Sequence, residues 1–113
     1  MHEAAIIRQV IEIAEVEARR VGAERITLIK LRIGEFRGVV ATALEFAFDV
    51  LQRGSLAEGA RLVVETTPLR MSCEECGEYD CSLSRLSLYC PGCGKQVDVV
   101  GGRDLEVEYV EVA

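Results

Sequence analysis

The sequence predicts an α+β fold in the order helix, strand, helix, strand, cysteine-rich insertion and closing strand. Two stretches carry apolar residues at spacings of three and four, which is the repeat of an amphipathic helix. Three others alternate apolar with polar residues or are rich in β-branched side chains, as strands are. All five cysteines fall between residues 73 and 93, in a segment with few aliphatic side chains.

The first predicted helix covers residues 4–21, where apolar residues line one face and charged residues the other. Gly22 marks its predicted end, because glycine commonly follows the last helical turn. The apolar face is formed by Ile7, Val10, Ile11, Ala14, Ala18 and Val21.

A strand is predicted over residues 25–33, because the apolar repeat there shortens to two. Lys30 and Arg32 point away from its apolar face, and Gly34 and Gly38 bracket a predicted turn. The apolar face is formed by Ile29, Leu31 and Ile33.

The second predicted helix covers residues 40–53 and ends at Gly54. A strand rich in β-branched residues follows over residues 61–67 and ends at Pro68. The helix is expected to bury Val40, Leu44, Ala47, Phe48 and Leu51.

The closing strand is predicted over residues 104–112, where apolar residues alternate with Glu106 and Glu108. Opposite charges that face each other across strands are favourable, so these two acids should lie near Lys30 or Arg32. The apolar positions are Leu105, Val107 and Tyr109.

Residues 70–102 are predicted to form a module that interrupts a first domain made of residues 1–69 and 103–113. The module carries every cysteine and few apolar side chains, so it cannot easily build a core of its own. A bound metal ion is the expected substitute for that core.

The paired cysteines form two copies of Cys-x-x-Cys-Gly, separated by thirteen residues. Two intervening residues let a tight turn direct both sulfurs at one ion, and the glycine accepts the positive φ that such a turn needs. Four thiolates suit tetrahedral zinc with no position left open for a substrate, which predicts a structural, zinc-ribbon-like site. The predicted ligands are Cys73, Cys76, Cys90 and Cys93.

Other metals and other cysteine chemistry are the alternatives to zinc. Iron also binds four thiolates, and the closed symmetric spacing favours zinc without deciding the choice. A thioredoxin-like redox site would need one pair at the start of a helix, and neither pair precedes a predicted helix. Cys81 lies outside both pairs and is interpreted as a small apolar filler, with a substitute ligand or a reactive thiol left open.

The net charge of −6 argues against nucleic-acid binding, whose electrostatic footprint is basic. We expect a soluble cytoplasmic protein, because the sequence shows neither a secretory-signal pattern nor an apolar run long enough for a membrane span. In that compartment clustered cysteines more often hold metal than form disulfides. With one histidine, few acid–base schemes are available, so no enzyme activity is expected. Glu45 is expected on a solvated helix face, and a role for Glu35 stays open.

The one histidine is His2, and a residue at a chain end is usually solvated and without a role. We expect Met1 to be retained, because removal of the initiator methionine requires a small second residue. The amino group of Met1 with the amide nitrogen and imidazole of His2 then offers a nearly planar nitrogen chelate. Such a donor set suits Ni(II) or Cu(II) rather than zinc, and its exposure suits an ion that must be released.

The chain resembles the HypA/HybF family of hydrogenase nickel-incorporation proteins. The resemblance covers essentially the whole chain. The opening tripeptide together with the two Cys-x-x-Cys-Gly segments, which we call knuckles, makes it specific. It rests on the Met1-His2-Glu3 start, the Ile33-Gly34-Glu35 turn, the Leu44-Glu45-Phe46-Ala47-Phe48 helix and the two Cys-x-x-Cys-Gly knuckles in this order.

The resemblance implies a nickel metallochaperone of two helices on a three-stranded mixed sheet, with a zinc module inserted before the last strand. It implies that Met1, His2 and Glu3 form the nickel site and that the paired cysteines hold structural zinc. The implied partners are a nickel-binding GTPase of the HypB type and the large-subunit precursor of nickel–iron hydrogenase, and some members also serve urease. The oligomeric state stays open, a homodimer included.

Two features depart from the family pattern. Some relatives carry an acidic residue in the loop before the second helix, where this chain has residues 37–40 without an acid, and the cysteine module here has no histidine. The fourth nickel ligand is therefore unassigned among Glu3 (through its amide or its carboxylate), water and a partner residue. The alternative function is a zinc-ribbon protein–protein adaptor in which His2 binds no metal.

Overall fold

The computed structural model describes residues 2–113, and Met1 lies outside the described residues. The described chain forms two compact units. The first contains the chain up to Arg32 together with Val39–Glu65 and Glu106–Ala113, and the second contains Ile33–Gly38 and Thr66–Leu105. None of the described helices is both long enough and apolar enough to cross a membrane.

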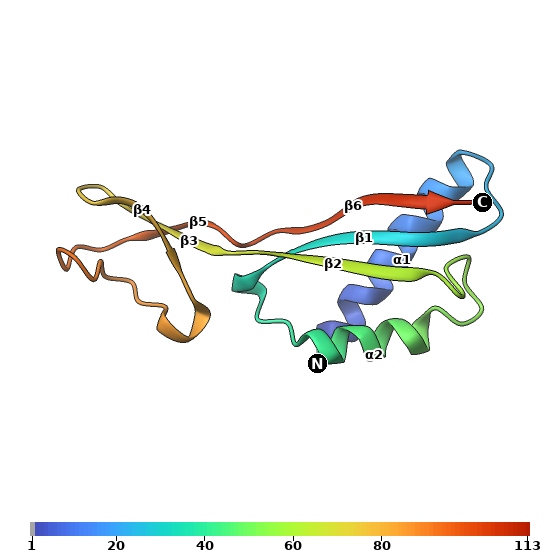
Figure 1. Ribbon diagram of the computed structural model, residues 1–113, viewed down its shortest axis with the longest axis horizontal. Helices are drawn as coiled ribbons and strands as arrows, with labels where there is room; N and C mark the ends of the chain where they lie inside the picture. The colour runs from blue at the N-terminus through green and yellow to red at the C-terminus, as the bar shows by residue number, and fades with distance from the viewer. Residues whose placement is uncertain (1) are drawn as a thin grey trace. The chain divides into compact units, whose positions relative to one another are not determined.

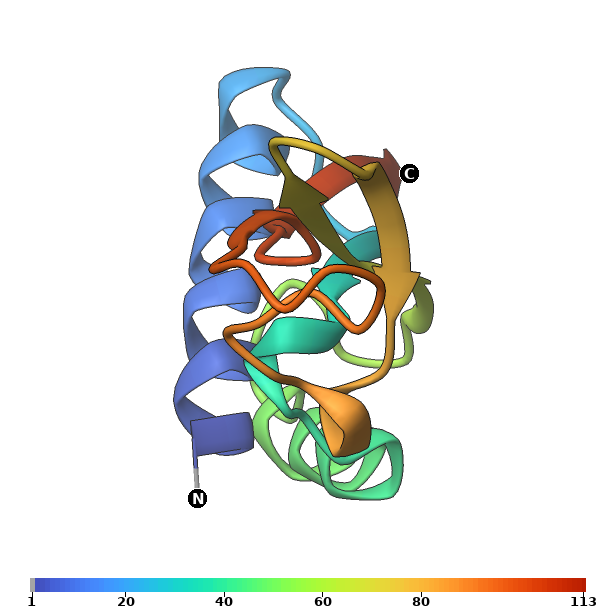
Figure 2. The ribbon, with the colours of Figure 1, turned by 90° about the vertical axis from the view of Figure 1, so that its left-hand side faces the viewer.

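Helix α1 (His2–Arg20) confirms the first predicted helix and its apolar stripe except at Val21, which lies beyond the last helical residue and is 60% exposed. Ile7, Ala14 and Ala18 are fully buried along that stripe, and Figure 2 shows the helix unbroken from end to end. Gly22 follows the last helical turn as predicted, with φ of 72°. The amide of Gly22 donates to the carbonyl of Arg19 and that of Ala23 to the carbonyl of Ala18, which satisfies carbonyls of the last turn.

The first sheet has the strand order β2-β1-β6, so β1 (Ile26–Gly34) lies between β2 (Arg61–Thr67) and β6 (Leu105–Val112). The amide of Ala113, just after β6, donates to the carbonyl of Arg25, just before β1. At the other end the amide of Gly34 donates to the carbonyl of Asp104, so β6 runs antiparallel to β1. Figure 1 shows β2 running in the same direction as β1. The sheet is therefore mixed, as expected.

The charged face of β1 pairs with the acids of β6 as predicted. Arg32 lies 2.6 Å from Glu108 and 3.6 Å from Glu106, while Lys30 lies 3.9 Å from Glu108. Lys30 also lies 3.4 Å from Glu65 of β2. The opposite face of β1 is apolar and buried, at Ile29, Leu31 and Ile33.

Helix α2 (Ala41–Leu51) packs against α1 and buries Leu44, Ala47 and Phe48 as expected. The expected burial of Val40 is wrong, because its side chain is 56% exposed. Val40 is the N-cap residue with extended backbone (φ −89°, ψ 119°), so it does not continue the apolar stripe of the helix. Leu51, at the other end, is only half-buried.

The second unit contains a sheet that the sequence pattern does not predict. Strands β3 (Leu69–Cys73), β4 (Gly77–Cys81) and β5 (Asp98–Gly101) form it in the order β4-β3-β5, with both pairings antiparallel. The short helix η1 (Glu35–Arg37) occupies the predicted turn between Gly34 and Gly38, and η2 (Leu83–Arg85) follows β4 (Figure 2). A small core supports the sheet, made of Leu69, Met71, Cys73, Cys90 and Val97.

Candidate metal centres

The two Cys-x-x-Cys-Gly segments occupy two tight turns of the second unit. Cys73 is the last residue of β3 and pairs with Gly77, the first of β4, so the first segment is a hairpin turn. In the second segment the amide of Gly94 donates to the carbonyl of Cys90 at 2.8 Å. Gly77 and Gly94 have φ of 85° and 78°, which confirms why glycine follows each second cysteine.

These turns bring the four predicted zinc ligands together. All four sulfurs lie within 4.8 Å of one another. The distance between the Sγ atoms of Cys73 and Cys93 is 3.5 Å. The four residues are Cys73, Cys76, Cys90 and Cys93. Four thiolates bound to zinc at about 2.3 Å in a tetrahedron lie about 3.8 Å apart, so the cluster fits zinc. Cys73 and Cys90 are buried while the other two are exposed, which ties the cluster to the small core on one side.

Backbone groups already favour one thiolate of the cluster. Hydrogen bonds from the backbone at Cys93 and Gly92 lower the pKa of Cys90 to about 7. Hydrogen bonds with the neighbouring thiols, that of Cys90 first, raise the pKa of Cys76 to about 12. Four sulfurs at this spacing cannot all ionise without a cation between them, and a dication removes that penalty.

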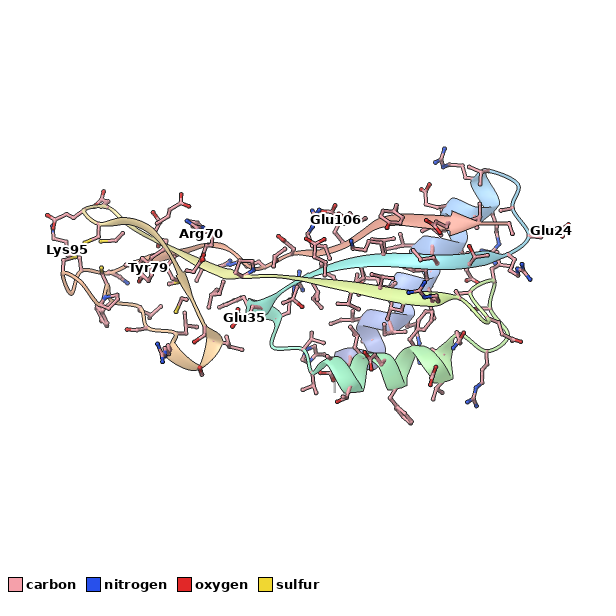
Figure 3. The ribbon with its side chains drawn as sticks, viewed as in Figure 1. Glu24, Glu35, Arg70, Tyr79, Lys95 and Glu106 are labelled. Carbon is pink, nitrogen blue, oxygen red and sulfur yellow. The ribbon has the colours of Figure 1, made fainter. Side chains whose placement is uncertain are left out.

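The charges around the cluster do not form a basic surface. Lys95 lies 2.8 Å from Glu75, and Figure 3 shows sulfur atoms at the end of the unit that carries Lys95. Arg70 lies 2.6 Å from Asp80 and 3.4 Å from Glu78. Two of the three basic residues of the module are thus paired with acids, which leaves little unpaired positive charge in this unit.

Cys81 is not part of the cluster. Its thiol donates to the carbonyl of Ser82 at 3.3 Å, and its side chain packs, half-buried, against the small core of the second unit. This placement agrees with the interpretation of Cys81 as an apolar filler.

The predicted nickel residues lie at the start of α1. Met1 lies outside the described residues, and His2 is the exposed first residue of the helix. Glu3 is buried, at 6% exposure, and its Oε2 accepts a hydrogen bond of 3.1 Å from the amide of Val40. That bond lowers the pKa of Glu3. The Glu3 carboxylate therefore ties the start of α1 to the residue that precedes α2.

Replacing Glu3 should loosen this tie in a way that depends on the new side chain. In Glu3→Ala the Val40 amide loses its acceptor and should exchange with solvent about tenfold faster or more, because that local contact would be open. Glu3→Gln keeps a side-chain oxygen that can accept the bond and should retain most of the protection. Hydrogen exchange of the assigned Val40 amide measures both, and equal rates in Glu3→Ala and the unmodified chain would contradict the contact.

Glu35, whose role stayed open, binds within the second unit. Its Oε1 accepts a hydrogen bond of 3.0 Å from the amide of Leu83 in η2. Glu45 is exposed on α2, as expected for a solvated face. Neither the Glu3–Val40 nor the Glu35–Leu83 contact could be found from the sequence, because the partners are backbone groups 37 and 48 residues away.

Comparison with known sequences gives one consistent result. Residues 1–112 match the family model described as hydrogenase/urease nickel incorporation, metallochaperone, HypA. A hydrogenase maturation factor HypA of Cereibacter sphaeroides is 42% identical over 113 residues, which cover 99% of each chain. The protein of the same description from Escherichia coli K12 is 34% identical, over 99% of this chain and 97% of its own.

Solved structures share the fold. The solution structure of the Ni metallochaperone HypA from Helicobacter pylori matches 99% of this chain and 97% of its own with a TM-score of 0.68. At 22% sequence identity this likeness supports the arrangement of helices and sheets.

Proposed function

Because this chain belongs to the HypA family of hydrogenase/urease nickel-incorporation metallochaperones, we propose that it carries Ni(II) to an immature nickel–iron hydrogenase. The observation that supports this most directly is the exposed His2 at the start of α1, next to the anchored Glu3. The family description also names urease, which we propose as a second recipient enzyme.

The proposed nickel site consists of the Met1 amine, the amide nitrogen and imidazole of His2, and the amide nitrogen of Glu3. Amides in the first turn of a helix have no partner within the helix, so those of His2 and Glu3 remain available. The Glu3 carboxylate is engaged with Val40, so we assign it the task of holding this segment in place rather than of donating to nickel. Because His2 is exposed, a recipient protein can reach the ion directly.

We propose that the four-cysteine cluster of the second unit holds zinc in a structural role. Zinc would neutralise the four thiolates and join the β3–β4 turn to the segment 90–94. A closed set of four ligands leaves no position for a substrate, which supports a carrier without catalytic turnover. We place the protein in the cytoplasm, where reducing conditions keep the cysteines available as thiolates.

The proposed partners are those that the family role requires. A nickel-binding GTPase of the HypB type would supply or stabilise the nickel-loaded form, and the hydrogenase large-subunit precursor would receive the ion. Both would have to approach the start of α1, because that is where the proposed nickel donors lie.

Nickel titration of the zinc-loaded chain tests the proposed nickel site. The chain that begins at Met1 should bind one equivalent of Ni(II) with amine and imidazole nitrogen donors visible by X-ray absorption. His2→Ala removes the imidazole, and one residue added before Met1 removes the free amine, so each should lose that equivalent. Zinc content should be unchanged in both.

Arg8→Ala provides the matched control, because it changes an exposed residue of α1 without touching a proposed donor. It should bind nickel like the unmodified chain. Equal nickel binding by all four proteins would refute the terminal site and leave the zinc-ribbon adaptor as the function.

A further inference from the structure

A groove of about 460 Å³ runs between the second half of α1 and strand β6 in the first unit. Ile13 and Val21 contribute exposed apolar surface from the helix side, with 42% and 60% of each residue accessible. The strand side is formed by residues 107–110 and Val112. None of these residues belongs to the metal centres described above.

The groove follows the edge of β6 rather than one of its faces. Successive side chains of a strand point to opposite faces, so a surface that includes the consecutive residues 107–110 must contain the edge between the faces. In the described part of the chain, β1 is the only strand beside β6. Alternate amides and carbonyls of β6 therefore point away from β1, toward the groove.

A free strand edge beside a helix can take up an extended peptide as an additional strand. Backbone hydrogen bonds hold such a peptide, and every second side chain enters the space under the helix. The apolar side chains at Ile13, Val21 and Val107 would contact those residues. Strand β6 has eight residues and no proline, so the whole edge can pair.

The charges at this edge select the peptide. Strand β6 carries Glu106, Glu108 and Glu111 and no basic residue. On the helix side Arg20 is bound to Glu17 at 2.7 Å, so it does not offset them. Glu108 is already paired with Arg32 and Lys30 of β1. The side chain of Glu106 is 57% exposed and lies 3.6 Å from Arg32, so its carboxylate can still pair with a further cation.

We propose that the groove between α1 and β6 binds an extended segment of a partner protein in which apolar residues alternate with lysine or arginine. The segment would pair with β6 as a fourth strand, place its apolar side chains under α1 and its basic side chains beside the glutamates. A second copy of this chain fits less well. Two-fold pairing of β6 with itself would put the Glu106 and Glu108 side chains of both copies on one face, where like charges repel.

The test uses the full, zinc-loaded chain labelled with ¹⁵N and a capped eight-residue peptide that alternates lysine with valine. Amide shifts should saturate and concentrate in β6 and the second half of α1, and the β6 amides should gain protection from exchange. A peptide that alternates glutamate with valine should not bind. The lysine–valine peptide N-methylated at every second residue on its pairing edge should bind at least about tenfold more weakly, because it cannot form the backbone bonds.

Two matched helix variants locate the contact. Ile13→Glu places a charge in the groove and should lower the affinity for the lysine–valine peptide about tenfold, because an apolar contact residue is lost. Val16→Glu changes a residue of α1 that is more accessible than Ile13 and does not line the groove, so this variant should bind the peptide like the unmodified chain. The proposal fails if shifts spread over the acidic surface, if both variants bind alike, if the N-methylated peptide binds as well, or if the chain dimerises through β6.

Discussion

Cys90→Ser should release zinc and unfold the second unit while the helices of the first unit remain. Cys90 is buried and belongs both to the four-sulfur cluster and to the small core of this unit. That core contains five buried residues, two of them cysteines of the cluster. Structural zinc supplies roughly 10–16 kcal/mol in small zinc-dependent peptides, far more than so few apolar side chains can replace.

Zinc content and amide exchange measure this outcome together. The variant should contain no zinc, and the amides of β3, β4 and β5 should lose protection, whereas those of α1 and α2 keep it. Removal of zinc from the unmodified chain by a chelator should produce the same pattern. Cys81→Ser is the matched control, because Cys81 lies in the same unit but outside the cluster. A full zinc equivalent in Cys90→Ser, or loss of zinc in Cys81→Ser, would contradict the assignment.

Local sequence patterns were sufficient for the elements of the first unit. The end of α1 at Gly22 depends on glycine's access to positive φ, and the pairing of Arg32 with Glu106 and Glu108 depends on which residues share a strand face. The first is a local property of one residue, and the second follows from the alternation within each of two strands, so the sequence reveals both. The four-cysteine cluster was equally predictable from the sequence, because the spacing within each pair is fixed by the turn that presents it.

The second sheet and the tertiary contacts were harder to predict from the sequence. Strand β3 does alternate buried Leu69, Met71 and Cys73 with less buried residues, but five residues that end in a metal-binding motif give a weak strand signal. Val40 fits the apolar repeat of α2, yet the helix starts one residue later, and helix starts are poorly defined by periodicity. The Glu3–Val40 bond joins distant segments, and no local pattern encodes it.

Gly34→Ala should be among the most destabilising single substitutions in this chain. Gly34 approaches Gly102 within the second unit so closely that an alanine Cβ would collide with the Gly102 carbonyl group and lie 2.7 Å from the Arg103 nitrogen. The same segments are joined by short backbone bonds, including 2.7 Å from the Gly34 amide to the Asp104 carbonyl. The added methyl group must break those bonds, so we expect a loss of about 3 kcal/mol or more in the free energy of unfolding.

Gly22→Ala separates this steric effect from the general cost of replacing glycine. Gly22 has φ of 72° but no other atom within 4 Å of an added Cβ, so its substitution should cost only about 1–2 kcal/mol through the left-handed backbone. Gly34 has φ of −81°, which any residue adopts, so its entire cost must come from the collision. Urea unfolding of both variants with zinc bound measures the difference. Equal losses would show that Gly34 and Gly102 do not approach each other, because only that contact makes the first substitution the worse one.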